Sequence, residues 1–165
     1  MIGLEPAEPS VQVAKQHAAR DPILQDRLTY ECTTLEEYVG RAGTEQVDLV
    51  VASEVIEHVV NPPLFAHNVC KLVKPGGGCL FTTINRTPLS YLVAIVMAEY
   101  VMNVITRGTH DWHKFVTPQE VTDMLTDDGM AVTFVKGMSF NPLTRKFSWS
   151  SSDSVNYALF AVKPD

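Results

Sequence analysis

The most regular pattern of hydrophobic and polar positions covers residues 47–59, which read Val-Asp-Leu-Val-Val-Ala-Ser-Glu-Val-Ile-Glu-His-Val. The first half is almost continuously apolar, which predicts a strand buried on both faces, as in a parallel sheet. The polar residues begin where this strand should stop, with Ser53, Glu54, Glu57 and His58. The pattern therefore predicts polar chemistry at the carboxyl end of a central strand, the edge where open α/β sheets hold their ligands.

A helix and a second strand follow. Across residues 63–73 the apolar positions recur with roughly helical spacing, and Pro75-Gly76-Gly77 predicts the end of that helix. Residues 79–84 then read as an extended segment. On the N-terminal side, we predict strands at 2–5 and 28–32, a helix capped by Ser10 that runs to about residue 20, and a helix at 35–41 capped by Thr34.

The C-terminal part continues this alternation. It predicts a long helical region at 89–105 and a helix opened by Thr117-Pro118-Gln119-Glu120 that ends near Gly129. Two closing strands are predicted at 130–138 and 154–162, joined by a hairpin-like connection at 140–153. The elements together predict an α/β fold with a mostly parallel sheet and two antiparallel strands at its C-terminal end.

Composition agrees with a single globular domain over residues 1–165. The chain is 45% hydrophobic, enough for one sizeable core, and has no repeat or low-complexity segment. The formal net charge of -6 argues against nucleic acid as the main partner. The three cysteines form no Cys-x-x-Cys pair, which favours a reducing compartment over a secreted disulfide scaffold.

Several motifs carry a resemblance to a known family. The strand, helix, Lys74-Pro75-Gly76-Gly77 and strand are similar to the middle of class I S-adenosylmethionine-dependent methyltransferases. Ser-Glu-Val-Ile-Glu-His at 53–58 and Gly-Thr-His-Asp-Trp at 108–112 are more specific, and with them the chain resembles the ubiquinone-biosynthesis O-methyltransferases from about Ile2 to its C-terminus. The resemblance implies a Rossmann-like class I methyltransferase fold, in which residues 86–116 form an insertion that faces the substrate and the membrane.

One family motif has no counterpart here. Family members begin with a strand and a Gly-x-Gly-x-Gly-type loop that wraps the methionine part of the cofactor, whereas Met1-Ile2-Gly3-Leu4-Glu5 resembles the second strand. We therefore expect an N-terminally truncated form that lacks the first strand and the glycine-rich loop. Because that strand usually lies in the middle of the sheet, its loss should leave unpaired backbone groups beside a gap.

The resemblance implies that S-adenosylmethionine binds at strand ends. Glu5 would bond the ribose hydroxyls, since a carboxylate presents two acceptors to two neighbouring donors; the alternative is an exposed acid in a turn. Thr33, Thr34 and Leu35 would flank the adenine, although a plain helix cap at Thr34 explains them equally well. Ser53 would contact the methionine or ribose end of the cofactor, or would simply end its strand.

Glu54, Glu57 and His58 are the candidate catalytic and metal-binding residues. At positions i, i+3 and i+4 of a helical turn they would share one face. The resemblance implies Mg²⁺ there, although Mn²⁺ or Zn²⁺ would suit an imidazole ligand better, and the metal would lower the pKa of a catechol oxygen. Without metal, Glu57 or His58 could act as general base on the phenol, and His58 could also serve only to orient substrate.

Two segments could meet a substrate with a long apolar tail. Residues 89–105 are marginal for a membrane span, so we expect either a core helix over the substrate pocket or peripheral membrane contact, for which the flanking Arg86 and Arg107 suit anionic head groups. The next segment combines aromatic and titratable side chains. It predicts a substrate-pocket loop, or a structural loop in which the tryptophan packs, formed by His110, Trp112, His113, Lys114 and Phe115.

The resemblance implies S-adenosylmethionine-dependent O-methylation of a catechol hydroxyl on a polyprenylated ubiquinone precursor. The implied partners are this catechol, the inner-membrane lipid surface and other ubiquinone-biosynthesis proteins. The implied location is the matrix side of the mitochondrial inner membrane, as a peripheral protein, or the cytoplasmic membrane face in a bacterium. The absent glycine loop keeps a second hypothesis open, a catalytically inactive interaction or membrane-associated module. A dehydrogenase is disfavoured because no Gly-x-Gly-x-x-Gly fingerprint occurs.

Overall fold

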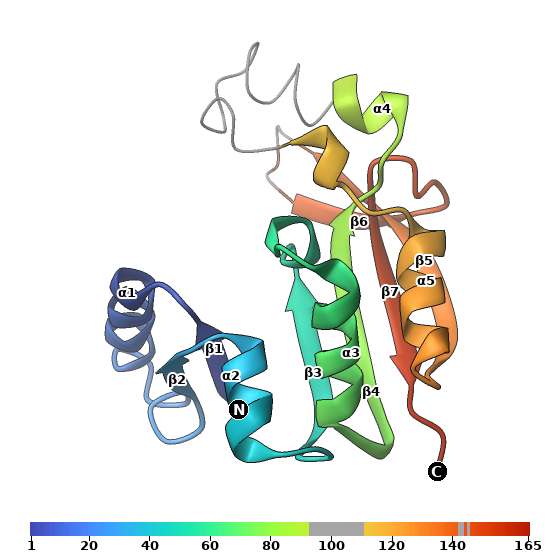
Figure 1. The fold of residues 1–165 in the computed structure, drawn as a ribbon. Coiled ribbons are helices and arrows are strands. Elements are labelled where there is room, and N and C mark those ends of the chain that lie inside the picture. The colour runs from blue at the N-terminus through green and yellow to red at the C-terminus, as the bar shows by residue number, and fades with distance from the viewer. Residues whose placement is uncertain (93–110, 142–143, 145) are drawn as a thin grey trace. The chain divides into compact units, whose positions relative to one another are not determined.

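A computed structural model describes residues 1–92, 111–141, 144 and 146–165 of the chain. Figure 1 labels the helices and strands of this structure. The chain divides into two compact units, Met1–Gly43 and Thr44–Asp165. Each unit has its own sheet, so the elements of each are described separately.

The first unit contains two strands, each followed by a helix. β1 (Ile2–Glu5) and β2 (Thr29–Cys32) pair in parallel, with Glu5 opposite Cys32 at their carboxyl ends. α1 (Glu8–Ala18) connects the two strands, and α2 (Leu35–Ala42) follows them. The buried hydrophobic residues of this unit are Val11 and Ala18, both on α1, so its core is small.

The two helices of the first unit begin in different ways. α1 begins before the predicted cap: its N-cap is Ala7, whose side chain makes no capping bond, and Ser10 lies inside the helix. Pro9 explains this start, because its fixed φ suits a first helical turn, where no amide donor is needed. α2 has the predicted cap, with the Thr34 hydroxyl accepting from the Glu37 amide and the Glu37 carboxylate accepting from the Thr34 amide.

The second unit contains a five-stranded sheet in the order β3-β4-β7-β5-β6. β3 and β4 pair in parallel, and the other three pairings are antiparallel, so this sheet is mixed and the predicted antiparallel strands at its C-terminal end are confirmed. The short connection between β5 and β6 accounts for their antiparallel pairing. The strands are β3 (Val47–Ser53), β4 (Val73–Ile84), β5 (Ala131–Asn141), β6 (Lys146–Ser150) and β7 (Asn156–Val162).

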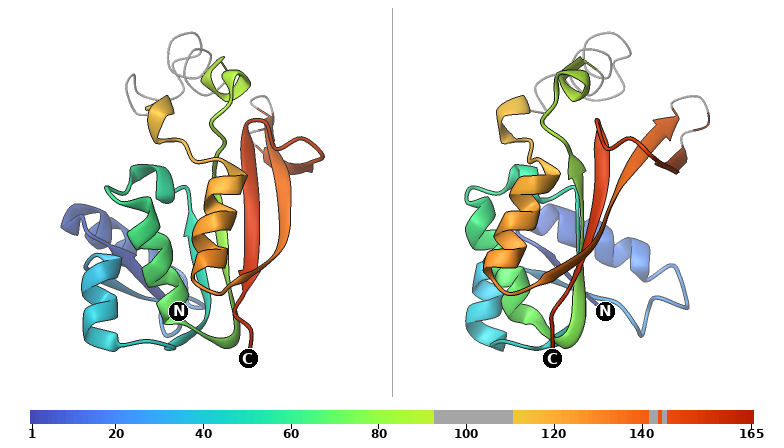
Figure 2. Two further views of the ribbon diagram at one scale, coloured as in Figure 1. Left: turned by 45° about the vertical axis from the view of Figure 1, so that its right-hand side comes forward. Right: turned by 90° about the vertical axis from the view of Figure 1, so that its right-hand side faces the viewer.

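Two helices cover one face of this sheet. α3 (Pro62–Leu72) and α5 (Pro118–Asp127) lie side by side on that face, as Figure 2 shows. The core lies beneath them, where Phe65 of α3 meets Phe81 of β4 edge to face with ring centroids 6.3 Å apart. α4 (Pro88–Ser90) follows the end of β4, and most of the predicted helical region at 89–105 lies outside the described residues. No helix in the described ranges is long and apolar enough to cross a membrane.

β3 is not buried on both faces as predicted. Leu49 and Val51 are 53% and 57% exposed, whereas Ala52 is buried on the face that α3 covers. Among the described strands, β3 pairs with β4 alone and β1 with β2 alone. Within the described strands, β3 therefore lies at the edge of its sheet, and the expected gap beside it stays a prediction.

Candidate functional site

Hydroxyl and carboxylate side chains meet at the carboxyl ends of β3 and β4. The Thr82 Oγ1 atom lies 2.8 Å from Ser53 Oγ and donates to Glu54 Oε1 at 3.0 Å. One position later, Thr83 Oγ1 donates to Glu57 Oε2 at 2.9 Å, and both of these residues are buried. The parallel register places Ser53 opposite Thr82, so sheet pairing brings the two segments together. The predicted edge of the sheet does gather polar side chains.

Glu54 stands outside the helical turn that follows β3. Its φ is +53°, a left-handed conformation that non-glycine residues seldom adopt, and the 3₁₀ turn covers Ile56–His58. The Glu54 amide donates to the Thr82 carbonyl at 2.8 Å and so extends the strand pairing by one residue. The prediction that Glu54, Glu57 and His58 share one helical face is therefore wrong, because strand pairing holds Glu54 before the turn begins.

Glu54 and Glu57 form a carboxyl pair. The Glu54 residue is exposed at the rim, but its carboxyl group is crowded by Thr82 and by a hydrogen bond with Glu57. Desolvation, followed by the charge of Glu57 and this hydrogen bond, raises the pKa of Glu54 to about 7, against the opposing effect of the Thr82 hydroxyl. Such a pair holds a shared proton near neutral pH or is neutralised by a cation.

The described residues do not assemble the predicted three-residue metal site. Two carboxylates offer the oxygen ligands that hard divalent cations prefer. In the described part of the chain, no group of three or more His, Cys, Asp or Glu side chains is arranged to hold a metal ion, so His58 does not complete such a site. Mg²⁺ at Glu54 and Glu57 therefore stays a prediction.

A cavity of about 460 Å³ opens beside the buried end of this network. It brings the predicted catalytic residues Glu57 and His58 together with Lys114 and Phe115 of the predicted substrate loop, which come from a distant part of the sequence. Close to the turn that follows β3, the side chains that line the cavity are mostly apolar. The lining residues are Ile56, Glu57, His58, Val59, Val60, Pro62, Pro63, Arg86, His113, Lys114, Phe115, Val116, Glu120 and Met124.

His113 of the predicted substrate loop also lines the cavity, but not every residue of that loop does. Trp112 does not line the cavity: its Nε1 donates to the Thr87 carbonyl at 3.0 Å, and its ring meets Tyr91 edge to face. These contacts agree with the alternative in which the tryptophan packs. Phe115 is buried and presents little surface to the cavity. His110 lies outside the described residues.

Sequence analysis did not identify an ion pair in the cavity wall, between Arg86 and Glu120. Arg86 Nη1 also donates to the Phe115 carbonyl at 3.1 Å. Partial burial alone would raise the pKa of Glu120, but the Thr117 amide and hydroxyl and the Arg86 guanidinium outweigh it, and the pKa is lowered. Sequence analysis placed Arg86 beside an apolar segment and Glu120 in a helix cap, and nothing in their spacing indicates a pair.

In the first unit, the predicted cofactor residues meet at the ends of β1 and β2. The Thr33 amide donates to the Glu5 carbonyl at 3.2 Å. Glu5 Oε1 accepts from the Ala7 amide at 2.9 Å, which is the turn role named as its alternative. Thr33 Oγ1 donates to Glu37 Oε2 at 3.0 Å, and Thr34 caps the helix that Leu35 begins. These contacts fix the local turn, and the cofactor roles of the four residues and of Ser53 stay predictions.

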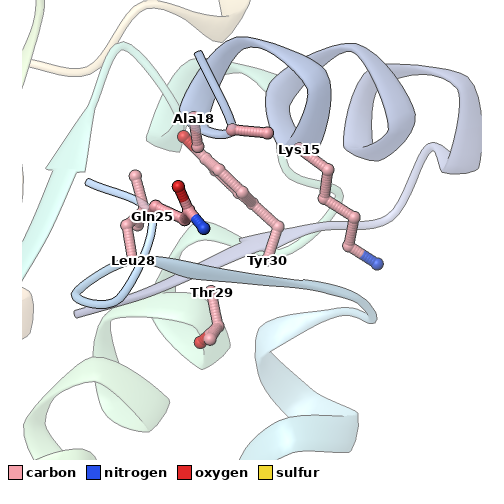
Figure 3. Close-up of a pocket in the computed structure, with 7 residues that line it drawn as sticks. Lys15, Ala18, Gln25, Leu28, Thr29 and Tyr30 are labelled. Atoms are coloured by element: carbon pink, nitrogen blue, oxygen red, sulfur yellow. The ribbon is translucent and has the colours of Figure 1, made fainter. Parts of the chain in front are cut away.

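A second cavity, of about 310 Å³, lies within the first unit. Figure 3 shows the Tyr30 ring extending toward Ala18, whereas the Lys15 amine points away from the other labelled side chains. None of the predicted site residues lines it, and neither does any carboxylate. Its lining residues are Lys15, Ala18, Ala19, Gln25, Leu28, Thr29 and Tyr30. The cavity beside Glu57 and His58 is therefore the candidate site.

Known proteins share this fold and much of this sequence. A family model described as a methyltransferase domain matches residues 1–134. The mitochondrial ubiquinone biosynthesis O-methyltransferase of Homo sapiens is 41% identical over 163 residues, covering 99% of this chain and 44% of the relative. The ubiquinone biosynthesis O-methyltransferase of Methylobacterium nodulans is 44% identical over 164 residues, covering 99% of this chain and 64% of the relative.

A solved structure supports the fold. A Thermotoga maritima S-adenosylmethionine-dependent methyltransferase, described as a possible histamine N-methyltransferase, matches with a TM-score of 0.67 at 16% identity, covering 98% of this chain and 72% of the other. This likeness shows the Rossmann-like methyltransferase fold. The chain spans about half the length of the animal relatives it matches. Because the family model covers most of its residues, the chain belongs to the methyltransferase domain family, and it is similar to ubiquinone biosynthesis O-methyltransferases.

Proposed function

We propose that this protein acts in ubiquinone biosynthesis, as an S-adenosylmethionine-dependent O-methyltransferase that methylates a catechol hydroxyl on a polyprenylated precursor. Similarity to relatives named ubiquinone biosynthesis O-methyltransferases supports the proposal. The observation that carries it is the polar network of Glu54, Glu57, Thr82 and Thr83, which lies at the strand ends and opens onto the cavity containing His58.

The reaction asks for alignment and one proton acceptor. A phenol oxygen must lose its proton and face the methyl carbon in line with the departing sulfur. S-adenosylmethionine, when bound, supplies a methyl group activated by its sulfonium charge. His58 lies at the exposed wall of the cavity and is suited to accept the phenol proton. Glu57 is buried and held by Thr83, which suits it to orient a ring hydroxyl.

Activity can be tested by transfer of a labelled methyl group from S-adenosylmethionine to a polyprenylated catechol. We expect transfer by the wild type, a fall in kcat of about 100-fold in His58→Ala, and a comparable fall in Glu57→Gln. Val13→Ser, an exposed change on α1, is the matched control. Absence of both methyl transfer and S-adenosylhomocysteine binding in the wild type would support the alternative, a non-catalytic interaction module.

The cofactor contacts of the first unit need a separate test. Glu5 would bond ribose hydroxyls with the acceptor capacity that its bond to Ala7 leaves, and Thr33, Thr34 and Leu35 would lie against the adenine. Ser53 remains a proposed contact of the second unit. Isothermal titration with S-adenosylhomocysteine should give a weaker Kd for Glu5→Ala than for the wild type. Equal affinities would leave Glu5 with its turn role alone.

We propose that Glu54 and Glu57 hold a divalent cation, Mg²⁺, whose charge would lower the pKa of a catechol hydroxyl. Thermal unfolding near pH 8 should then show a rise in Tm with added Mg²⁺ or Mn²⁺, because a ligand that binds only the folded state stabilises it. Glu54→Gln and Glu57→Gln should lose this rise, and Glu36→Gln should keep it. A rise that survives in all three variants would assign the cation to another place.

The polyprenyl tail implies that substrate is delivered from a lipid surface. We propose peripheral association with the mitochondrial inner membrane in a eukaryote, or with the cytoplasmic membrane face in a bacterium, together with other ubiquinone-biosynthesis proteins. Turnover of a long-tailed catechol and of a short, water-soluble one, each measured with and without vesicles, distinguishes delivery from a membrane from a reaction in solution. Vesicles should raise turnover of the long-tailed substrate and leave that of the short one unchanged, and equal effects on both would argue against delivery from a membrane.

A further inference from the structure

The β5–β6 hairpin has one aromatic face and one polar face. Met138 stands opposite Trp149, and Phe140 stands opposite Phe147. Opposed residues, and residues two apart on a strand, share a face, so these four side chains lie together. The other face carries Ser139, Asn141, Lys146 and Ser148. Such alternation ordinarily turns the apolar face toward a core.

Here the aromatic face is exposed. Phe140, Phe147 and Trp149 are 42%, 60% and 59% exposed, and the two phenylalanine rings lie 5.0 Å apart. Rings of this size are seldom left in water without a partner.

The face points away from the helices. Lys136 and Phe134 precede Met138 on the same face of β5, and Phe134 stacks on Phe160, which pairs with Leu80 of β4. The next residue of β4 is Phe81, which faces α3. Figure 2, right, shows the hairpin extending to the side opposite α3 and α5. These helices therefore do not cover the aromatic rings.

The hairpin is basic although the chain is acidic. Residues 134–150 include Lys136, Arg145 and Lys146 and no acidic residue, in a chain with a net charge of -6. The Lys136 Nζ atom lies 5.3 Å from the centroid of the Trp149 ring, a cation–π contact at the border of the aromatic face. Lys136 thus lies with the aromatic rings on one exposed face, whereas Lys146 lies on the other face of the hairpin, and a base beside exposed rings suits a partner that is both anionic and apolar.

A second apolar group lies at the same end of the sheet. β4 ends at Ile84, which pairs with Asn156, and Asn156 in turn pairs with Met138, where the hairpin begins. α4 follows the end of β4, and Leu89 on α4 and Leu92 just after it are exposed. Figure 1 shows α4 and β6 toward the same end of this unit.

We propose that the β5–β6 hairpin binds an anionic lipid surface, with Phe140, Phe147 and Trp149 entering the head-group boundary and Lys136, on the same face, pairing with a lipid phosphate. Aromatic rings favour that boundary because they are apolar with a polar or polarisable edge, and nearby bases add attraction to anionic lipid. The chain's overall negative charge disfavours nucleic acid as the partner. The surface binds lipid whether or not the proposed methyl transfer occurs.

Co-sedimentation with phosphatidylcholine vesicles, with and without about one third phosphatidylglycerol, tests this. The wild type should bind the anionic vesicles more tightly. Phe147→Ser with Trp149→Ser should weaken that binding about tenfold, because the apolar contact is removed. Lys136→Ala should weaken it at low salt and little at high salt. Val13→Ser with Ile23→Ser, which removes exposed apolar groups from the first unit, is the matched control.

The fluorescence of Trp149 gives a second measurement of lipid contact, and this measurement is made on the wild type. Fluorescence of the wild type should move to shorter wavelength on anionic vesicles, and Trp149→Phe should lose most of that change. Circular dichroism of each variant checks that the fold is retained. Unchanged vesicle binding in the Phe147 and Trp149 double variant would overturn the proposal. A wild-type dimer that becomes monomeric in this variant, with vesicle binding unaltered, would assign the face to self-association and also overturn it.

Discussion

At the scale of single residues, the chemistry of the candidate site depends on which carboxylates are held by hydroxyl groups and which are crowded. Thr82 and Thr83 are neighbours on β4, yet they donate to different glutamates. Thr83 serves the buried Glu57, and Thr82 serves Glu54 at the rim. Alternation along the strand thus separates a fixed carboxylate from one that can exchange its proton.

The raised pKa of Glu54 predicts a pH dependence of stability. Between its ordinary value of 4.5 and about 7, the folded state holds the proton and the unfolded state does not. The free energy of unfolding contributed by this group is therefore greatest below pH 4.5 and is lost as pH rises through 7. Glu54→Gln should gain stability relative to the wild type between about pH 5 and pH 8 in urea unfolding. A constant difference between the two proteins would show that the pKa is not raised.

Removing the Thr83 hydroxyl tests the buried contact. Thr83→Val keeps the side-chain shape but leaves the buried Glu57 carboxylate without this donor, so it should lower the free energy of unfolding by about 1–3 kcal/mol. Thr82→Val is the matched control, and its cost should be smaller because Glu54 reaches solvent. Urea unfolding near pH 7 measures both, and equal losses would contradict the assigned difference.

At the scale of elements, helix starts depend on whether a side chain satisfies the first amides. Thr117 opens α5 with a capping box: its hydroxyl accepts from the Glu120 amide, and Glu120 accepts from the Thr117 amide at 2.8 Å. α1 has no such side chain and relies on Pro9. A hydroxyl side chain therefore stabilises the start of α5, whereas at α1 the hydroxyl residue Ser10 lies inside the helix and makes no cap.

Alanine substitutions separate the two starts. Thr117→Ala should lower the free energy of unfolding by about 1 kcal/mol, because an amide at the start of α5 loses its partner. Ser10→Ala should change it by less than about 0.5 kcal/mol, because Ser10 makes no cap. Chemical denaturation of both variants provides the comparison, and a cost at Ser10 equal to that at Thr117 would restore the predicted cap.

At the scale of the whole molecule, the two units have unequal cores. The first unit buries Val11 and Ala18, whereas the second buries large side chains that include Phe81, Leu125, Tyr157 and Leu159. Tyr157 also donates its hydroxyl to the Val116 carbonyl at 2.9 Å, which ties β7 to the segment before α5. Because apolar burial supplies most of the driving force for folding, stability should differ between the units.

Hydrogen exchange at low urea can resolve that difference. Amides of α1, α2 and β2 should lose protection at lower urea than amides of β4 and β7, which each pair with a strand on both sides. β3 should fall between them, since within the described strands it pairs on one side. Loss of protection in all these elements at one urea concentration would mean that the units unfold as one.

The sequence by itself determined the elements whose cause is local. Capping residues fixed the starts of α2 and α5, and the 3.6-residue pattern fixed α3, because these depend on neighbours a few positions apart. The motifs also placed polar groups at the end of β3, and Ser53 to Glu57 do lie there. The family followed from the same motifs and agrees with the methyltransferase domain match.

Tertiary structure decided what depends on distant partners. The apolar run of β3 could not reveal that Leu49 and Val51 would be exposed, since exposure depends on which strands and helices lie alongside. Phe147 and Trp149 alternate with serines, a pattern that could have predicted β6, but the pairing that places them on one exposed face with Phe140 is not local. The pairing of Arg86 with Glu120 likewise arises only when the fold brings the two side chains into contact. Ion pairs and hydrogen bonds act over a few ångströms in space, whatever the separation of the residues along the sequence.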